Sequence, residues 1–256
     1  MKVNAIKTPR ISVGTTTLIQ LLDANVRDIP SGSVLAITSK IISLCEGSVA
    51  TAEVDKDSLI RDEADYYLPG AHSKYGIKFT ITQGTLIPNA GIDESNSGDG
   101  YVLWPRDPQA TANAIRAHLA HRFSRDRIGV VITDSTCKPL RRGVSGIGIA
   151  FSGFKPLRNY IGTPDLFGRP LAVSQADLVG GLAAAAVLVM GEGSESTPLA
   201  LLEDVDFIDF VSRDPSAEEL APLQITVDED LFAPFLEKVQ WQPGGRSKRA
   251  NEGGMP

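Results

Sequence analysis

The apolar residues of the chain gather in runs whose spacing separates strands from helices. Short continuous apolar runs bounded by turn residues predict strands at 34–38, 101–104 and 128–133. Apolar residues spaced three and four apart predict helices at 15–22, 109–123 and 178–190. Because helices and strands do not alternate regularly, the pattern favours an α+β fold over a doubly wound sheet.

Four further stretches have a different pattern. The charged segment Asp55–Leu68 predicts a helix that ends at Pro69-Gly70, and the apolar–polar alternation over 77–82 predicts a half-exposed strand. Glycine alternates with apolar residues over Gly143–Gly153, which indicates a close approach of backbones or a sharp bend. The end of the chain lacks apolar periodicity, so we expect one folded unit over 1–242 and a flexible tail over 243–256.

Composition narrows the class of protein. The chain has 256 residues, 42% of them hydrophobic, which is enough for a core without a disulfide or metal staple. Its net charge of −6 disfavours a nucleic-acid binder, because phosphate backbones require clustered Lys and Arg. The longest apolar stretch, Leu178–Met190, is too short to span a membrane, and we find no signal peptide. With only two cysteines, Cys45 and Cys137, we expect a cytoplasmic protein.

Several familiar signatures are absent from the sequence. There is no phosphate-binding loop ending in Gly-Lys-Ser/Thr, no Gly-x-Gly-x-x-Gly after a strand and no paired Cys-x-x-Cys. His118 and His121 lie three apart on a predicted helix, but no carboxylate or thiol accompanies them in the sequence. We therefore interpret them as solvated surface residues and not as metal ligands.

Polar residues follow predicted strands and helices in three loops: Asn89–Asn96, Thr133–Ser135 and Met190–Thr197. Each loop offers a carboxylate beside hydroxyls, amides or glycines. Hard cations such as Mg²⁺ and Mn²⁺ bind oxygen ligands of this kind, and glycines let backbone N–H groups approach a phosphate. The same residues also form ordinary turns. Composition alone therefore leaves a metal-dependent site and three plain turns both open.

The exact strings add a family resemblance. Five of them occur in order: Asn89-Ala90-Gly91-Ile92-Asp93 with Ser95-Asn96, Ile132-Thr133-Asp134-Ser135, Arg141-Arg142-Gly143, Asp165-Leu166-Phe167-Gly168-Arg169 and Met190-Gly191-Glu192-Gly193. Together they resemble the coenzyme F420-0:L-glutamate ligase family, over about Ile6 to Leu202. The set is specific, although no single string is. The resemblance implies an α+β fold of two intertwined subdomains and a tight homodimer.

The resemblance also implies a reaction. Enzymes of this family use GTP and two divalent cations, Mg²⁺ or Mn²⁺, to form an amide between L-glutamate and a carboxylate of the deazaflavin precursor F420-0 or F420-1. The acceptor carboxylate becomes an acyl phosphate, and the glutamate amine then displaces the phosphate. A carboxylate needs such a leaving group to become an electrophile, and phosphoryl transfer depends mainly on positioning and charge neutralisation.

Site residues follow from the resemblance, position by position. Asp93 and Asp134 resemble the ligands of one metal, and Ser135 and Glu192 those of a second. The expected catalytic residues are Asp134, Arg141 and Arg142, since a guanidinium matches a phosphate or a carboxylate. The expected nucleotide-binding residues are Thr8, Pro9, Arg10, Ile11, Ser39, Lys40, Asn96, Met190, Gly191, Glu192, Gly193, Ser194, Glu195, Ser196 and Thr197.

One position departs from the family pattern. The segment Ser43-Leu44-Cys45-Glu46-Gly47 matches a motif that usually reads Ser-Lys-Ala-Glu-Gly, so Leu44 stands where the family has a nucleotide-contacting lysine. Lys40, Arg10 or Lys138 are the candidates to replace that charge. The choice between GTP and ATP therefore stays open. So do a folate-type acceptor, a non-catalytic nucleotide-binding relative and a purely structural protein.

Overall fold

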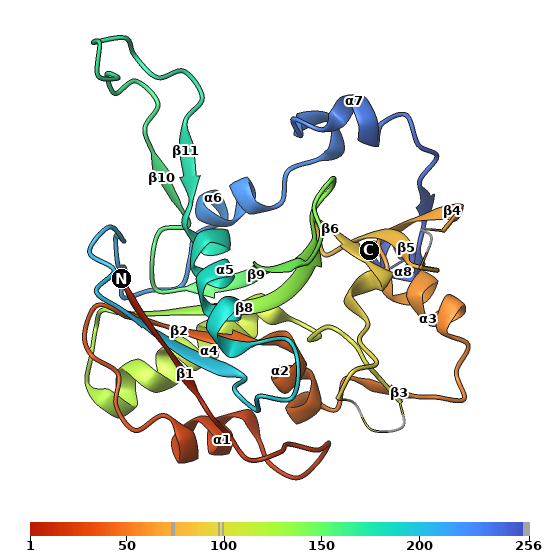
Figure 1. Cartoon of the computed structure of the whole chain (residues 1–256), viewed down its shortest axis with the longest axis horizontal. Helices are drawn as coiled ribbons and strands as arrows, with labels where there is room; N and C mark the ends of the chain where they lie inside the picture. Colours follow the sequence, from red (N-terminus) through yellow and green to blue (C-terminus); the bar gives the residue numbers. More distant parts are fainter. Residues whose placement is uncertain (73–74, 97, 99, 253–256) are drawn as a thin grey trace.

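The structure, a computed structural model, describes residues 1–72, 75–96, 98 and 100–252. Its centre is a five-stranded sheet in the order β1-β12-β2-β8-β9 (Figure 1). These strands are β1 (Lys2–Ile6), β2 (Ser33–Thr38), β8 (Ile128–Cys137), β9 (Val144–Ser152) and β12 (Leu199–Glu203). The pair β2 and β8 is parallel and the other neighbours are antiparallel. The carboxyl ends of β2 and β8 therefore lie at one edge, with Thr38 opposite Thr133.

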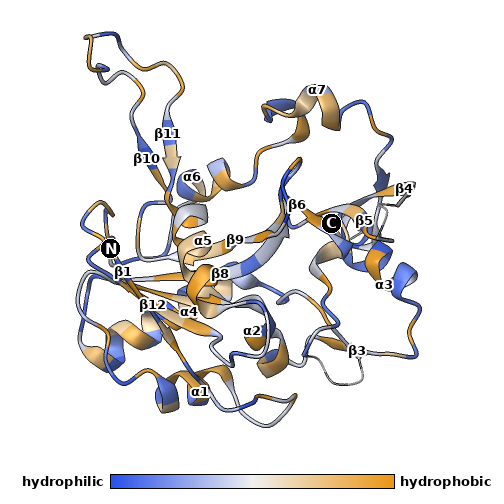
Figure 2. Cartoon of the chain, in the orientation of Figure 1, coloured by the Kyte–Doolittle hydropathy of each residue, from blue (hydrophilic) through white to orange (hydrophobic). Residues whose placement is uncertain are grey.

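Helices cover both faces of the central sheet. On one face, α1 (Leu18–Asn25), α2 (Ser39–Glu46) and α4 (Pro108–Phe123) share a core with Leu35 and Ile37 of β2. On the other face, α5 (Leu178–Met190) shares a core with Val34 and Ala36. Successive strand side chains point to opposite faces, so β2 is buried on both sides, which explains its unbroken apolar run. Figure 2 shows the apolar residues running through the central strands and α5.

The glycines of β9 let α5 lie directly on the sheet. A Cβ added at Gly146 would collide with the carbonyl oxygen of Ala183, and one added at Gly148 would collide with Val179. Both contacted residues belong to α5, so the expected close approach of backbones is confirmed. The helix begins and ends where the sequence predicts, with the carboxylate of Asp177 accepting a hydrogen bond from the N–H of Gly180 at 2.8 Å.

A second sheet, in the order β13-β4-β5-β6, lies beside the first (Figure 1). Its strands are β4 (Tyr66–His72), β5 (Lys78–Thr82), β6 (Thr85–Pro88) and β13 (Gln242–Pro243). The helices α3 (Lys56–Glu63) and α8 (Gly245–Glu252) pack against each other next to it. The chain thus leaves the central sheet after α2, builds most of this second unit, returns at α4, and closes the second unit with its last described residues.

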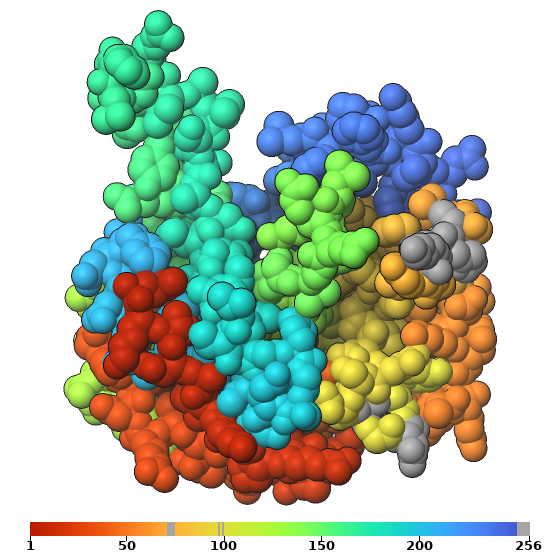
Figure 3. Space-filling view, viewed as in Figure 1, coloured from red at the N-terminus to blue at the C-terminus, as the bar shows by residue number. Residues whose placement is uncertain are grey.

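The remaining elements are short. Two strand pairs complete the sheets: β3 (Val49–Thr51) with β7 (Gly100–Val102), and β10 (Leu157–Asn159) with β11 (Gln175–Asp177). The short helices are η1 (Asn89–Gly91), α6 (Ala217–Leu220), η2 (Ala221–Leu223), η3 (Val227–Glu229) and α7 (Ala233–Leu236). The segment joining β10 to β11 projects from the body of the molecule as an arm, residues 160–174 (Figure 3). These elements confirm the α+β class. Within the described residues, no helix has the length and apolar character needed to cross a membrane.

One expectation about the second unit was wrong. The helix predicted over Asp55–Leu68 ends at Glu63, and the chain then enters β4, whose main chain pairs with β5. Within the tail expected over 243–256, Pro243 is the last residue of β13 and α8 follows. The backbone N–H of Gly244 donates to the carbonyl of Asp65 at 2.8 Å. The backbone N–H groups of Arg246 and Lys248 also donate to main-chain carbonyls. Backbone hydrogen bonds, which any sequence can form, hold these residues in place. The segment therefore needs no apolar pattern to adopt this structure. Residues 253–256 of the predicted tail lie outside the described residues.

The strand β5 is present as predicted, but its polar face is the buried one. Lys78, Thr80 and Thr82 are buried, whereas the side chain of Phe79 is 38% exposed. The hydroxyl of Thr80 accepts from the backbone N–H of Ala90 at 2.8 Å and donates to the carbonyl of Ile87, and Lys78 forms an ion pair with Asp57. Each of these partners belongs to the second unit, so the burial follows from tertiary contacts that an alternating pattern does not reveal.

Candidate active site

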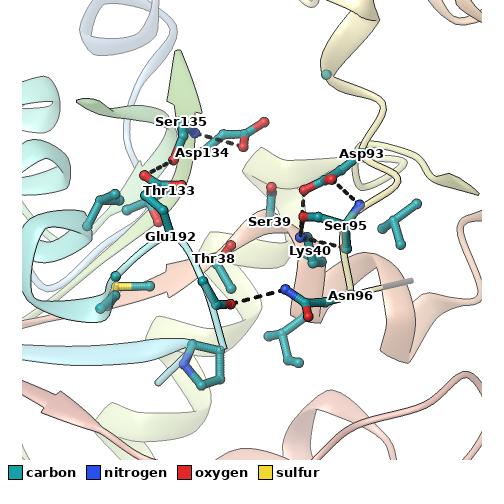
Figure 4. A pocket seen from close by; sticks show the side chains of 18 of the residues that line it. Thr38, Ser39, Lys40, Asp93, Ser95, Asn96, Thr133, Asp134, Ser135 and Glu192 are labelled. Carbon is teal, nitrogen blue, oxygen red and sulfur yellow. Dashed lines mark hydrogen bonds and ion pairs between the residues drawn. The ribbon is translucent and has the colours of Figure 1, made fainter. Parts of the chain in front are cut away.

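A cavity of about 720 Å³ opens at the carboxyl ends of β2 and β8 (Figure 4). This is a size typical of small-molecule sites. Five separate chain segments meet there, and they include every metal or nucleotide residue expected from the sequence: Thr8, Pro9, Arg10, Ile11, Ser39, Lys40, Asp93, Asn96, Asp134, Ser135, Met190, Gly191, Glu192, Gly193, Ser194, Glu195, Ser196 and Thr197. The three polar loops of the sequence therefore line one cavity, which three unrelated turns would not do.

The N-terminal residues of α2 line this cavity. The helix follows β2 without a loop, and its N-cap, Thr38, makes no side-chain cap. The first N–H groups of such a helix attract anions, phosphate above all. Lys40, in the first turn, forms an ion pair with Asp93 at 2.6 Å and donates to the carbonyl and hydroxyl oxygens of Ser95, both at 2.9 Å (Figure 4). Lys40 thus lies as a cation in the first turn of α2, beside the N–H end of that helix.

Asp93 reaches the cavity through a turn of unusual backbone conformation. Asn89, Ala90 and Gly91 all have positive φ angles, of 52°, 56° and 73°. Asparagine and glycine adopt this region readily, whereas alanine there is strained by about 1 kcal/mol. The backbone N–H of Ala90, held by Thr80, stabilises the turn. After this turn, the main chain of Asp93 pairs with the main chain of Val102. The N–H of Asp93 donates to the carbonyl of Val102 at 3.0 Å, and the N–H of Val102 donates to the carbonyl of Asp93 at 2.8 Å.

Asp134 lies at the end of the buried part of β8, on the other side of the cavity. Its two carboxylate oxygens accept from the indole N–H of Trp104 and from the backbone N–H of Ser135, the latter at 2.8 Å. Burial raises the pKa of Asp134 to about 6, although both hydrogen bonds act to lower it. At Asp93, burial also acts to raise the pKa, but the hydrogen bond and charge of Lys40 hold that pKa below its usual value.

The loop after α5 completes the cavity wall. The hydroxyl of Ser135 donates to Glu192 at 2.7 Å, and the side-chain amide of Asn96 donates to the carbonyl of Gly193 at 3.1 Å (Figure 4). On its far side, the carbonyl of Ser196 accepts from the backbone N–H of Thr8 at 2.9 Å. The loop is thereby fastened to β8, to the Asp93 loop and to the N-terminal segment. Its glycine N–H groups are paired within the protein: that of Gly191 donates to the carbonyl of Val187 at 2.9 Å, and that of Gly193 donates to the carboxylate of Glu195 at 2.8 Å.

The donor atoms fit a hard divalent cation. Asp93, Asp134, Ser135 and Glu192 supply carboxylate and hydroxyl oxygens, and Ser135 and Glu192 already touch. Among the described residues, no three His, Cys, Asp or Glu side chains are gathered closely enough to form a ready-made metal cluster. Asp93 forms an ion pair with the Lys40 ammonium in this structure. The chemistry of the four donor side chains fits hard divalent cations.

Two expected catalytic residues are not in the cavity. Arg141 and Arg142 lie exposed at the turn of the β8–β9 hairpin, and Arg141 donates to the neighbouring carbonyl of Leu140 at 3.0 Å. Neither arginine is among the residues that line the cavity, and their catalytic role stays a prediction. Lys138, in the same turn, is also outside the cavity lining, whereas Arg10, Lys40 and Leu44 are part of it.

Sequence reasoning missed two residues that support the site. Trp104 contacts Asp134 from behind the cavity, and Thr80 holds the turn before Asp93. Neither has a sequence signal of its own, since Trp104 looked like the end of a strand and Thr80 like an exposed position. His118, expected to be solvated, lies on the surface of α4, where its Nε2 is hydrogen-bonded to the carboxylate of Asp23 at 2.7 Å, and it is not among the residues that line the cavity.

Comparisons with known proteins agree with this geometry. The sequence profile described as "F420-0:Gamma-glutamyl ligase" matches residues 56–204. A Methanopyrus kandleri protein named "Coenzyme F420:L-glutamate ligase" is 35% identical over 197 residues, which cover 70% of this chain and 78% of that relative. A protein of the same name from Archaeoglobus fulgidus is 30% identical over 241 residues, which cover 86% and 92%. The chain belongs to the F420-0:Gamma-glutamyl ligase family.

Proposed function

We propose that this chain is a ligase that joins the amine of L-glutamate to a carboxylate of coenzyme F420-0, or of its monoglutamylated product, at the expense of GTP. The observation that carries the proposal is the cavity at the ends of β2 and β8, where carboxylates, a helix N-terminus and a glycine loop converge. The names of the relatives support F420 as the acceptor and glutamate as the donor.

The reaction has two steps. The γ-phosphoryl group of the nucleotide passes to an oxygen of the acceptor carboxylate, and the nucleoside diphosphate leaves. The glutamate nitrogen then bonds to the activated carbonyl carbon, inorganic phosphate leaves, and the amine loses a proton. The chain contributes positioning: the N-terminus of α2 and Lys40 would bind phosphate oxygens beside the loop after α5.

Asp93 and Asp134 would hold one divalent cation, and Ser135 and Glu192 a second, Mg²⁺ or Mn²⁺ in each case. Bound there, the cations would neutralise the charge of the phosphates and of the developing acyl phosphate. Leu44 lies in the cavity wall one turn after Lys40. The positive charge that the family lysine would place near the phosphates would therefore come from Lys40 and Arg10.

We also propose a homodimer. Three projections carry large exposed apolar side chains on the same side of the molecule: the β8–β9 hairpin, the arm of residues 160–174, and the segment around α7 (Figure 3). Leu166 is fully exposed and Phe167 90% exposed at the tip of the arm, and Leu140 is 96% exposed in the hairpin. Such side chains favour burial against a second copy.

Both cysteines are free, which supports a reducing compartment.

A product assay tests the proposed reaction. The chain is incubated with L-glutamate, Mg²⁺ and Mn²⁺, with GTP or ATP in separate reactions, and with F420-0 or a folate as acceptor. Mass spectrometry should find one added glutamyl group on F420-0. The same product on the folate alone would keep the chemistry and refute the acceptor, and nucleotide binding without phosphate release in any reaction would refute catalysis.

Asp134→Asn is the matched site variant. We expect it to keep the fold and to lower turnover by about two to three orders of magnitude, since charge stabilisation at the phosphoryl group supplies several kcal/mol. A variant with near-normal turnover would contradict the metal assignment.

A further inference from the structure

Trp104 is buried next to the cavity, and its indole N–H donates to the carboxylate of Asp134, a residue of the site. It lies two residues after the end of β7 and is 6% exposed. Its indole N–H donates to Oδ2 of Asp134, while Oδ1 of the same carboxylate accepts from the backbone N–H of Ser135. Two N–H donors at fixed positions define both the rotamer and the plane of the carboxylate. Each oxygen keeps a further lone pair that can point into the cavity.

The indole ring also fills the space between two site loops. Gly91, in the turn that leads to Asp93, has no side chain at the point where a Cβ would overlap the indole nitrogen. Asp93 itself pairs with Val102, on the strand that leads to Trp104. The ring therefore touches the Asp93 loop on one side and the Asp134 carboxylate on the other. Its size and its N–H group together set the spacing of the two loops.

From this geometry we propose that Trp104 is a positioning residue of the metal site: its indole N–H orients the Asp134 carboxylate, and through it controls the affinity for a divalent cation. The inference rests on the proposed metal role of Asp134. Phenylalanine keeps a flat apolar ring at this position but has no donor and less volume, so the effect of the lost hydrogen bond is isolated by comparing Trp104→Phe with and without Asp134→Asn. Removing a group that orients a metal ligand typically lowers metal affinity about 10–100-fold.

The chain offers a matched control. Besides Trp104 it contains one other tryptophan, Trp241, whose indole N–H donates to the carbonyl of Leu236 at 3.0 Å and which is not among the residues that line the cavity. Trp104→Phe and Trp241→Phe are therefore the same chemical change at two sites. We expect Trp104→Phe to weaken Mn²⁺ binding at least about tenfold, and Trp241→Phe to leave it unchanged.

The experiment is a titration of the protein without substrates by Mn²⁺, followed by electron paramagnetic resonance of the free ion, with circular dichroism to check folding. Equal Mn²⁺ affinity in Trp104→Phe and the unmodified chain would overturn the inference. In Asp134→Asn, adding Trp104→Phe should cause no further loss, and an additional tenfold loss would equally refute action through Asp134. If the unmodified chain binds no Mn²⁺ at all, the proposed metal sites fail, and with them the inference.

A second measurement does not depend on whether Trp104→Phe folds. In the Trp241→Phe protein, Trp104 is the single indole, so its fluorescence reports directly on the proposed site. Mn²⁺ should change this emission with the same midpoint as the resonance titration. Emission that stays constant while Mn²⁺ binds would show that the ion does not reach the carboxylate that Trp104 holds, and would refute the inference.

Discussion

The buried carboxyl of Asp134 should make the metal-free protein less stable as the pH rises. Burial raises the pKa of Asp134 from its usual 3.8 to about 6 in the folded state. A carboxyl with a raised pKa favours folding when protonated, so its contribution is complete below about pH 4 and is lost as the pH rises through 6. Relative to the protonated form, the charged group costs about 3 kcal/mol at pH 8 and roughly half of that at pH 5.

Asp134→Asn removes this titration. The free energy of unfolding of the variant, relative to the unmodified chain, should therefore rise by roughly 1–2 kcal/mol from pH 5 to pH 8. For a chain of this length that corresponds to a difference of about 2–8 °C in the change of melting temperature. A constant loss of about 1–3 kcal/mol accompanies it, because an amide has one oxygen for the two N–H groups of Trp104 and Ser135. The pH dependence is thus the diagnostic quantity.

The assay is thermal and urea unfolding in EDTA at pH 5, 6, 7 and 8. Asp126→Asn, at an exposed position between α4 and β8, is the control for loss of one negative charge, and its stability should run parallel to that of the unmodified chain. A difference between Asp134→Asn and the unmodified chain that stays flat, or falls, from pH 5 to pH 8 would refute the reasoning about burial.

Three further predictions follow from individual contacts. Gly146→Ala should lower the free energy of unfolding by about 1–3 kcal/mol because its Cβ meets α5, whereas Gly181→Ala, which meets nothing, should raise it by about 0.5–1 kcal/mol; urea unfolding measures both. Thr80→Val should cost about 1–3 kcal/mol in the same assay by leaving the N–H of Ala90 without its acceptor, and no loss would contradict the role of Thr80. Leu44→Lys should leave GTP affinity in calorimetry unchanged or higher, and a large loss would contradict the assignment of Leu44 to the family lysine position.

The helix α5 illustrates what the local sequence can predict. Its apolar run, the capping Asp177 and the following Gly191 specify a buried helix, and the structure begins and ends it at the predicted residues. The glycines of Gly143–Gly153 likewise indicated a close approach of backbones. In each case the signal lies within a few residues, because helix capping and backbone clearance depend on local atoms.

The candidate site was partly predictable for the same reason. Polar loops that follow apolar runs, and the order of the family strings, predicted residues that the structure brings into one cavity. Arg141 and Arg142 belong to the same set of strings, yet the hairpin carries them outside the cavity lining. A string identifies a residue type at a position, but the length and direction of the strand before it decide where that residue lies.

The sequence by itself determined the α+β class, the central buried strands, the core helix and the polar loops that meet at the cavity. The tertiary structure alone decided which face of β5 is buried, that the chain end forms α8, and that Trp104 meets Asp134. These last features depend on contacts between residues far apart in the chain, such as Thr80 with Ala90 and Trp104 with Asp134. A side chain that buries a polar group must find a partner, and only the folded chain supplies that partner.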